Sequence, residues 1–392
     1  MENGLPAELR KSIAYSLPEG ERREDMLLSA GTSDIMELSK LPDETPLGVR
    51  YDGVSFSRDV RTFVPLPSPD EAPVSKIVQT SLPASFFYDG ALRSRRRFSF
   101  SGTQEKFTAR LIVRNAAPTL ENVDETNEVG NVIVKPWSGR YTFLPENEFF
   151  ILSLMSEMGF CTAVPRLLAT DDGKRHLVIE RFDIASDAGA YRRLRVRQFA
   201  ELMELSADEN GKYSVTTEEI LNFACAQIEE PQNFALAYAA GWSIGNGDMH
   251  AKNFSAVMDD DGCYRLAPLY DMLNTTVYEN MKDRLALPFG ECCNPSPDGA
   301  DLMEYFGERF GTDFLSELRR RLSLGMAALA PLHRMVVSLG EESPNRAAFL
   351  ERLAERTDTL MQSARRDMDT ALERICERTL REEPDMDIPT VR

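Results

Sequence analysis

The 392-residue sequence is poor in the residues that build metal centres and disulfide frameworks. It contains three histidines and six cysteines, and no two cysteines have the C-x-x-C spacing. A structural zinc site is therefore not expected, because such sites combine Cys and His ligands at short spacings. Cys292 and Cys293 are neighbours that cannot easily form a disulfide with each other. We accordingly expect reduced thiols and a reducing, cytoplasmic compartment.

Long apolar runs and a targeting segment are also missing. No stretch approaches the roughly 20 apolar residues that cross a bilayer, and the acidic start Met1–Gly4 is not followed by the apolar segment of a signal peptide. Basic residues are in the minority, with 45 Lys+Arg against 63 Asp+Glu and a net charge of −18. We therefore expect no membrane binding and no direct DNA binding, because DNA phosphates would be repelled. Contact with an operator would need a basic partner.

Both common glycine-rich phosphate-binding motifs are absent as well. There is no G-x-x-x-x-G-K-[ST], and no G-x-G-x-x-G occurs beside the first strand expected in the β-rich region over 85–183. The segment Phe98–Lys106 stands there instead, followed by a strand predicted over Phe107–Val113. Only Gly102 gives this loop backbone freedom. Such a loop would cover phosphates less closely than one with three glycines.

What the sequence does contain is the spacing of a kinase catalytic loop. Asp248 is followed by Asn253 and then by Asp271. In phosphoryl transfer one carboxylate accepts or orients the proton of the nucleophile, while an amide oxygen and a second carboxylate hold Mg²⁺. A buried helix predicted over Phe234–Gly245 precedes the loop, and a strand–turn–strand over 254–266 follows it. Because D-x-x-x-x-N alone arises often by chance, this interpretation depends on further motifs upstream.

Those motifs occur in the order of a kinase. A short strand over Val132–Val134 ends at Lys135, and Glu148 begins an apolar helical run over Phe149–Met158. Glu148 is placed to pair with Lys135 and hold its ammonium against nucleotide phosphates. Taken alone, Lys135 would be read as a surface lysine at a strand end. The order of the motifs favours the kinase interpretation.

A hairpin is predicted next, with strands over Arg166–Thr170 and Arg175–Ile179 and a turn at Asp171–Gly173. It leads into Glu180–Asp183. This is the place of the segment that connects the two lobes of a kinase and binds adenine through its backbone.

Three segments together, Phe98–Lys106, Gly245–Ser255 and Leu266–Asp271, resemble the HipA family of bacterial serine/threonine kinase toxins. The resemblance runs from about residue 15 to about residue 325. It implies an α+β, bilobal protein-kinase-like fold with a β-rich N-lobe and a mostly helical C-lobe, which uses ATP and Mg²⁺. The site residues it implies are Asp248 as catalytic base, Asn253 and Asp271 as metal ligands, and Lys135, Glu148, Glu180, Phe182, His250, Ser101, Gly102, Gln104 and Lys106 at the nucleotide, with His250 orienting or structural.

The resemblance also implies regulation by autophosphorylation. In the family, a serine of the phosphate loop is modified and the loop then leaves the nucleotide site, which shuts the kinase down. Ser99 aligns with the commoner serine position, and Ser101 completes a Ser-x-Ser pair like that of the short HipT-type members. Phosphorylation adds roughly two negative charges. Four arginines within Arg93–Arg97 could hold such a group, although an arginine run can also be a solvated face without a role.

The N-terminal region indicates partner proteins. Tyr15–Gly20 resembles a motif that follows a first small subdomain in full-length HipA proteins, and too few residues precede it here to form one. We expect that subdomain to be missing, as in toxins of three-gene systems, unless the chain is a divergent or truncated HipA. The expected partners are a small HipS-like protein, a helix-turn-helix HipB-like antitoxin and a protein substrate, which for members of this family is an aminoacyl-tRNA synthetase.

Composition shifts divide the chain into four expected regions. They are a remnant N-terminal region and connector over 1–84, a kinase N-lobe over 85–183, a helical C-lobe over 184–382 and a disordered tail over 383–392. Helical patterns in the C-lobe cover about 300–322 and 345–382.

Two other functions remain open. Small-molecule phosphotransferases of the antibiotic and choline type share the G-D-x-x-x-x-N loop but lack the serine loop. A catalytically inactive kinase fold within a repressor complex is the other alternative, and the complete set of motif residues argues against it.

Overall fold

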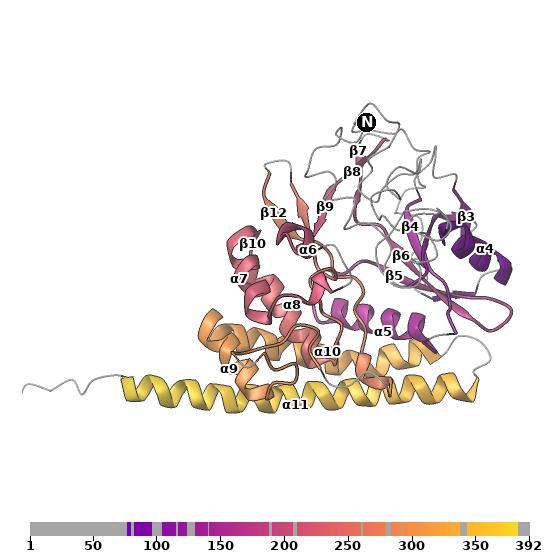
Figure 1. Ribbon diagram of the computed structural model, residues 1–392. Coiled ribbons are helices and arrows are strands. Elements are labelled where there is room, and N and C mark those ends of the chain that lie inside the picture. Colours follow the sequence, from indigo (N-terminus) through magenta and orange to yellow (C-terminus); the bar gives the residue numbers. More distant parts are fainter. Residues whose placement is uncertain are drawn as a thin grey trace, which may run out of the picture.

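The computed structural model describes residues 77–79, 82–95, 104–114, 117–123, 130–139, 141–187, 190–206, 210–259, 262–279, 284–291, 293–337 and 343–382. A β-rich lobe and a helical lobe lie side by side, and two long C-terminal helices run beneath both (Figure 1). This is the α+β, two-lobed kinase-like architecture that the sequence predicts. The expected loop serines and the first 76 residues lie outside the described residues.

A six-stranded sheet forms the β-rich lobe, in the order β1-β5-β6-β4-β2-β3. Only β1 runs parallel to its neighbour, β5, and all other pairs are antiparallel. The strands are β1 Ile77–Gln79, β2 Phe107–Arg114, β3 Ala117–Asn122, β4 Val132–Lys135, β5 Pro165–Ala169 and β6 Arg175–Glu180.

Helices cover the two faces of this sheet. Leu177 and Ile179 of β6 point toward α5 (Leu144–Glu157), whereas Val178 between them packs with Phe87 of α4 (Ala84–Arg95). This alternation follows from the two-residue period of a strand. It places the apolar helix α5 against β5 and β6, next to the strand that ends at Lys135, which positions the site.

The helical lobe contains a second, four-stranded sheet in the order β10-β12-β11-β9. Its strands are β9 Arg195–Gln198, β10 Ile228–Glu229, β11 Ser255–Met258 and β12 Tyr264–Leu266. A separate hairpin, β7 Ile184–Asp187 with β8 Ala190–Arg193, follows the connector between the lobes. The strand–turn–strand predicted over 254–266 is therefore confirmed as β11 and β12.

Helix α8 (Pro231–Ser243) is the centre of the helical lobe and confirms the buried helix predicted there. It begins with a proline, which suits the first helical turn because that position needs no N–H donor. Most of its side chains are buried on all sides, so small alanines dominate it. The helices around it are α6 Phe199–Leu202, α7 Thr217–Gln227 and α9 Gly299–Phe310, with short 3₁₀ turns η1 Gly211–Tyr213 and η2 Thr275–Val277.

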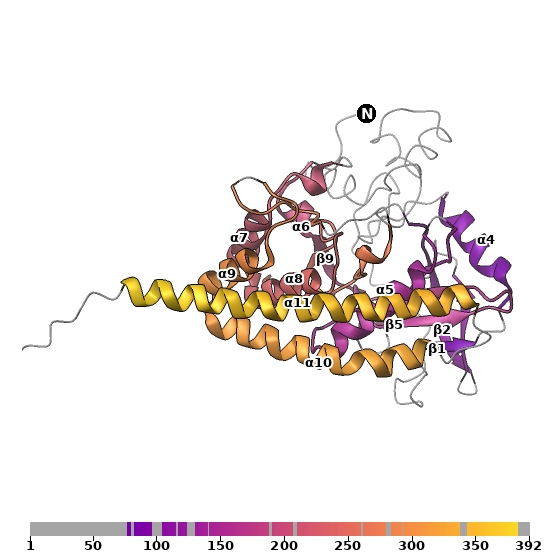
Figure 2. The same ribbon diagram turned by 90° about the horizontal axis from the view of Figure 1, so that it is seen from below.

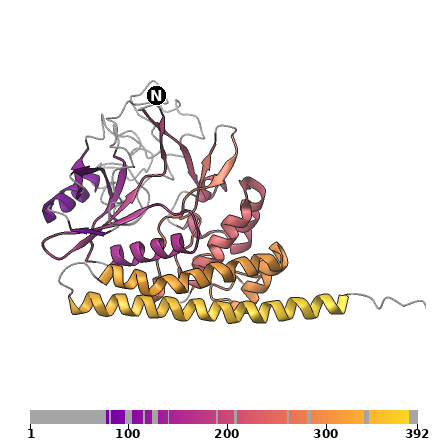
Figure 3. The ribbon, with the colours of Figure 1, turned by 180° about the vertical axis from the view of Figure 1, so that it is seen from behind.

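Helices α10 (Thr312–Val337) and α11 (Pro344–Glu382) form the antiparallel pair beneath both lobes (Figures 2 and 3). The helical pattern expected over 300–322 is in fact two helices, because Gly311 between α9 and α10 adopts a φ of 90°. Within the described residues, no helix combines the length and apolarity needed to cross a membrane.

Candidate active site

The site begins where β4 ends against α5. Lys135 is the last residue of β4, and its Nζ lies 2.6 Å from Oε1 of Glu148 in the second turn of α5. The two side chains are 4% and 2% exposed, so this is a buried ion pair. The pairing predicted from the sequence is therefore present.

Asp271 joins the pair from the helical lobe. Its Oδ1 accepts a hydrogen bond from Nζ of Lys135, so one ammonium bridges carboxylates from both lobes. Asp271 has a φ of 52°, a left-handed conformation that non-glycine residues adopt rarely and that is concentrated at functional sites. Its side chain remains 27% exposed, which leaves the carboxylate accessible to a ligand.

Burial and charge set the ionisation of this cluster. Burial raises the pKa of Glu148 to about 7, although the Lys135 ammonium acts in the opposite direction. Burial would also raise the pKa of Asp271, but Lys135, then Lys106 and His250, hold it well below its usual range. For Lys135, burial opposes the charge, yet Asp271 and Glu148 outweigh it and raise the pKa. Lys135 is thus cationic and Asp271 anionic at neutral pH.

Lys106 of the predicted phosphate loop directly precedes β2 and lies close enough to act on the same cluster. Lys106 is buried, and its charge acts on both Asp271 and Glu148. Nε2 of Gln104 is buried and has no hydrogen-bond partner among the described residues, so it is a donor available to a bound acceptor. Ser99, Ser101 and Gly102 fall outside the described residues.

The residues of the predicted catalytic loop follow α8. The backbone N–H of Asp248 donates to Oδ1 of Asn246 at 3.0 Å, and Nδ2 of Asn253 donates to the Asp248 carbonyl at 2.7 Å. These bonds close the loop on itself and leave the Asp248 side chain 45% exposed. Nε2 of His250, a buried residue, lies 3.8 Å from Oδ1 of Asp248, a place suited to orienting that carboxylate.

The connector between the lobes lies against the segment that carries Asp271. The Phe182 ring stacks on Tyr270, with 5.7 Å between the ring centroids. The Tyr270 hydroxyl donates to the Lys252 carbonyl at 3.0 Å and is 2.6 Å from the Ser255 hydroxyl. The carboxylate of Glu180 is paired with Arg166 at the end of β6.

Tyr270 therefore joins the connector to the catalytic loop. We did not predict this role from the sequence, although the residue's place beside Asp271 was visible there.

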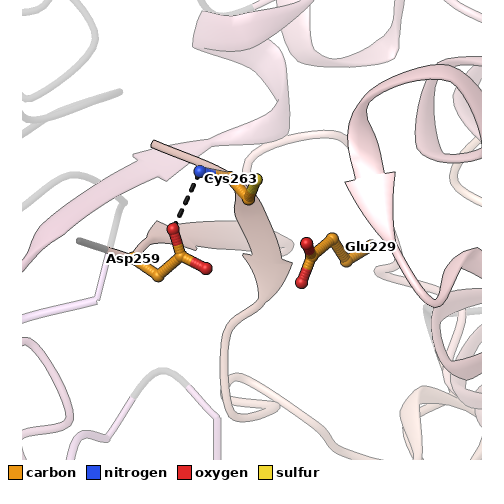
Figure 4. Close-up of side chains that lie close together, drawn as sticks. All are labelled: Glu229, Asp259 and Cys263. Atoms are coloured by element: carbon orange, nitrogen blue, oxygen red, sulfur yellow. Dashed lines mark hydrogen bonds between the residues drawn. The ribbon is translucent and has the colours of Figure 1, made fainter. Parts of the chain in front are cut away.

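A second group of potential ligand atoms has a simpler explanation. Glu229, Asp259 and Cys263 lie together at the edge of the small sheet (Figure 4). Nε of Arg265 lies 2.7 Å from Glu229 and 3.5 Å from Asp259, and Asp259 accepts the backbone N–H of Cys263 at 2.8 Å. These carboxylates thus already serve an ion pair and a β-turn.

Comparison with known proteins identifies the family. Residues 98–381 match the family described as the HipA-like C-terminal domain. This chain belongs to that family. A protein of Sinorhizobium fredii named "Putative kinase Y4mE" is 30% identical over 265 residues, which is 66% of this chain and 60% of that protein. A second, "Putative kinase Y4dM" of the same organism, is 29% identical over 208 residues, which is 49% of each chain. The chain thus spans about half to three fifths of the length of these curated relatives.

A solved structure supports the fold of this HipA-family member. This chain is similar to HipA of Shewanella oneidensis, whose solved structure is a complex with HipB and operator DNA, with a TM-score of 0.63 and 17% sequence identity. The likeness covers 93% of this chain and 88% of that chain. At this identity the match establishes the shared kinase-like fold.

Proposed function

We propose that this chain is an ATP- and Mg²⁺-dependent serine/threonine protein kinase. The observation that carries the proposal is the buried cluster of Lys135, Glu148 and Asp271, which joins the two lobes through one ammonium. In kinases a lysine held by a glutamate binds the phosphates, and a neighbouring aspartate binds the metal. The kinase names of the relatives agree with this proposal.

The residues present fit a magnesium ion. Carboxylate and amide oxygens are the ligands that Mg²⁺ prefers, and Asp271 and Asn253 supply one of each. Because Nδ2 of Asn253 donates to the Asp248 carbonyl, Oδ1 is the atom of this amide left for a metal. A magnesium ion held here would offset the negative charge of the nucleotide phosphates.

Each side chain then has a defined task. Lys135 binds phosphate oxygens and is kept in place by Glu148. Gln104 and Lys106, with Ser101 and Gly102 of the same loop, cover the phosphates. The exposed carboxylate of Asp248 accepts or orients the proton of an incoming hydroxyl, as a catalytic base does. The backbone around Glu180 and Phe182 binds adenine.

The experiment is phosphosite mapping in a bacterial lysate incubated with the purified chain, ATP and Mg²⁺. New phosphoserine or phosphothreonine on a protein is expected with the wild type and not with Asp248→Gln. Transfer only to a small molecule would favour the phosphotransferase alternative instead.

We further propose autophosphorylation of Ser99, Ser101 or both. Support comes from the position of these serines in the loop that leads to Lys106, whose charge acts on Asp271 and Glu148. Intact-mass spectrometry of the active protein should find phosphate there, and the Asp248→Gln variant should carry none. An active enzyme without phosphoserine would refute this part.

We also propose a cytoplasmic toxin–antitoxin role. The Shewanella oneidensis neighbour is described with HipB and operator DNA, which supports a helix-turn-helix HipB-like antitoxin as partner. A small HipS-like protein and an aminoacyl-tRNA synthetase substrate, whose modification would inhibit translation, complete the proposal. Co-expression with the genomic neighbours and pull-down should recover a three-component complex, whereas recovery of free kinase alone would contradict it. That this chain itself does not contact DNA stays a prediction from its charge.

A further inference from the structure

A buried asparagine pair joins the helix of Glu148 to the segment of Asp271. Nδ2 of Asn147 donates to the Asn274 carbonyl at 2.8 Å, and the Asn274 N–H donates to Oδ1 of Asn147 at 2.9 Å. Both residues are 0% exposed and stand 127 positions apart in the chain. Asn147 directly precedes Glu148, and Asn274 follows Asp271 by one short turn. The pair therefore fixes the backbone that carries Glu148 relative to the backbone that carries Asp271.

The segment that follows Asp271 also forms hydrogen bonds with the residues that precede Asp248. Oγ1 of Thr275 accepts the N–H of Gly247 at 2.9 Å, and the N–H of Thr275 donates to the Gly245 carbonyl at 2.9 Å. A Cβ built on Gly245 would lie 2.9 Å from Oδ1 of Asn274, so the Gly245 backbone packs closely against the Asn274 side chain. Because Gly247 precedes Asp248, the positions of Asp248 and Asp271 are linked through Asn274 and Thr275.

Helix α11 completes this network from below. The Asn274 side chain donates through Nδ2 to Oγ1 of Thr357 at 3.0 Å. Its Oδ1 accepts the N–H of Thr276 at 2.9 Å, so both ends of the amide are used. Thr357 is 0% exposed and bonds back to the Leu353 carbonyl at 2.7 Å, which fixes its rotamer.

The other side of Asp271 is anchored as well. The Leu269 N–H donates to the Cys161 carbonyl and the Leu269 carbonyl accepts the Ala163 N–H, each at 2.9 Å. Cys161 and Ala163 lie in the segment that leaves α5. The left-handed backbone of Asp271 is thus bracketed by two attachments, one to the beginning of α5 and one to the chain beyond its end. A sparsely populated conformation persists only where its surroundings impose it.

We propose that Asn147, Asn274 and Thr357 are positioning residues that set Asp271 for metal binding and hold it in register with Glu148 and Asp248. The inference rests on the proposed function, because it assigns these residues to the Mg²⁺–ATP site. None of the three side chains touches the nucleotide in this account. They act by fixing the backbone of the segment that carries the metal-binding carboxylate.

The test is ATP binding by calorimetry at stepwise Mg²⁺ concentrations, a readout that needs no turnover. Asn147→Leu keeps the side-chain size and removes both bonds to Asn274, so the Mg²⁺ concentration for half-maximal ATP binding should rise about tenfold or more. Thr357→Val keeps the side-chain shape and removes the bond from Asn274 together with the helix bond to the Leu353 carbonyl, so a rise of about fivefold is expected. ATP binding without Mg²⁺ should be unchanged in both variants.

Matched controls separate positioning from stability. Leu152→Ala removes core packing from the same helix α5 but none of these hydrogen bonds. Thr359→Val, two residues after Thr357, removes an exposed bond to the Glu355 carbonyl at 2.8 Å, which matches the Thr357–Leu353 bond and leaves the Asn274 bond intact. Neither control should change the Mg²⁺ requirement, even where the melting temperature falls.

The outcomes are distinct. If Thr357→Val and a folded Asn147→Leu both keep the wild-type Mg²⁺ requirement while the wild type transfers phosphate, the inference is wrong and the proposed function stands. If Asn147→Leu does not fold, the Mg²⁺ requirement of Thr357→Val is compared with that of Thr359→Val. A higher requirement in Thr357→Val supports the inference, and equal requirements refute it. If the wild type binds no ATP at any Mg²⁺ concentration, the proposed function fails and the inference fails with it.

Discussion

Replacing Lys135 with methionine tests the electrostatics of the central cluster. Methionine has a similar length and no charge, so the substitution removes the cation and leaves Glu148 and Asp271 facing each other. Removing one partner of a buried ion pair typically costs about 3–5 kcal/mol of unfolding free energy. Since Asp271 is 27% exposed and keeps part of its hydration, we expect the lower end, about 3 kcal/mol, at pH 7.

The cost should grow with pH. Burial raises the pKa of Glu148 to about 7 even with Lys135 present, and loss of the cation should raise it further. A carboxyl that is protonated when folded and ionised when unfolded lowers stability as pH rises, by about 1.4 kcal/mol per pH unit. In the wild type, folded Glu148 ionises near pH 7, so the unfolding free energy stops falling above that pH. In Lys135→Met, Glu148 stays protonated to a higher pH, so the unfolding free energy continues to fall. The deficit of the variant should therefore be about 1 kcal/mol larger at pH 8 than at pH 7.

Urea unfolding followed by tryptophan fluorescence measures both effects, because Trp137 lies two residues after Lys135. Lys174→Met is the matched control. Lys174 belongs to the same lobe and pairs with Asp172 at 3.1 Å, but its side chain is 32% exposed, so a loss below about 1 kcal/mol is expected. A Lys135→Met variant as stable as the control, or with a deficit that shrinks from pH 7 to pH 8, would refute the reasoning.

Three further predictions concern stability. Arg346→Leu leaves the fully buried Glu146 without its cation 3.1 Å away and should cost about 3–5 kcal/mol in urea unfolding, most of which Glu146→Leu should restore in the double variant. Burial lowers the pKa of His176 to about 4, so the neutral ring contributes stability above pH 6.5 that is lost as the pH falls toward 4. His176→Gln should remove up to about 3 kcal/mol of this pH dependence of the unfolding free energy. A variant whose unfolding free energy falls between pH 6.5 and pH 4 as steeply as that of the wild type would contradict this prediction. Gly245→Ala places a Cβ 2.7 Å from Leu360 at a φ of 85° and should cost about 1–3 kcal/mol, whereas a neutral effect would show that the loop adapts.

The sequence predicted the parts of the site that depend on local pattern. The strand ending at Lys135 and the helix of Glu148 are each part of a clear apolar run, so their pairing followed from a kinase's order of elements. The same holds for α8 and the hairpin of β11 and β12 around Asp248 and Asn253. For these elements, the local signal and the tertiary contacts agree.

Features that depend on distant contacts were not predicted. Asn147 and Asn274 are 127 positions apart, and nothing in the sequence around either asparagine indicates which residue it bonds to. Strand β1 falls in the region expected to be a remnant and connector, yet it extends the sheet through parallel pairing with β5. Helix α4 gave no clear apolar stripe, because its burial centres on Phe87 against the sheet. Long-range pairing decides all three, and spacing along the chain does not encode it.

The most direct test of the kinase assignment is transfer of the γ-phosphate of radiolabelled ATP by the purified chain, with and without Mg²⁺. The wild type should place label on serine or threonine hydroxyls only when Mg²⁺ is present. Asp248→Asn and Asp271→Asn should lower the rate by about 10²-fold or more while circular dichroism shows an intact fold. Equal labelling by either variant, or no labelling by a folded wild type that binds ATP, would contradict the account.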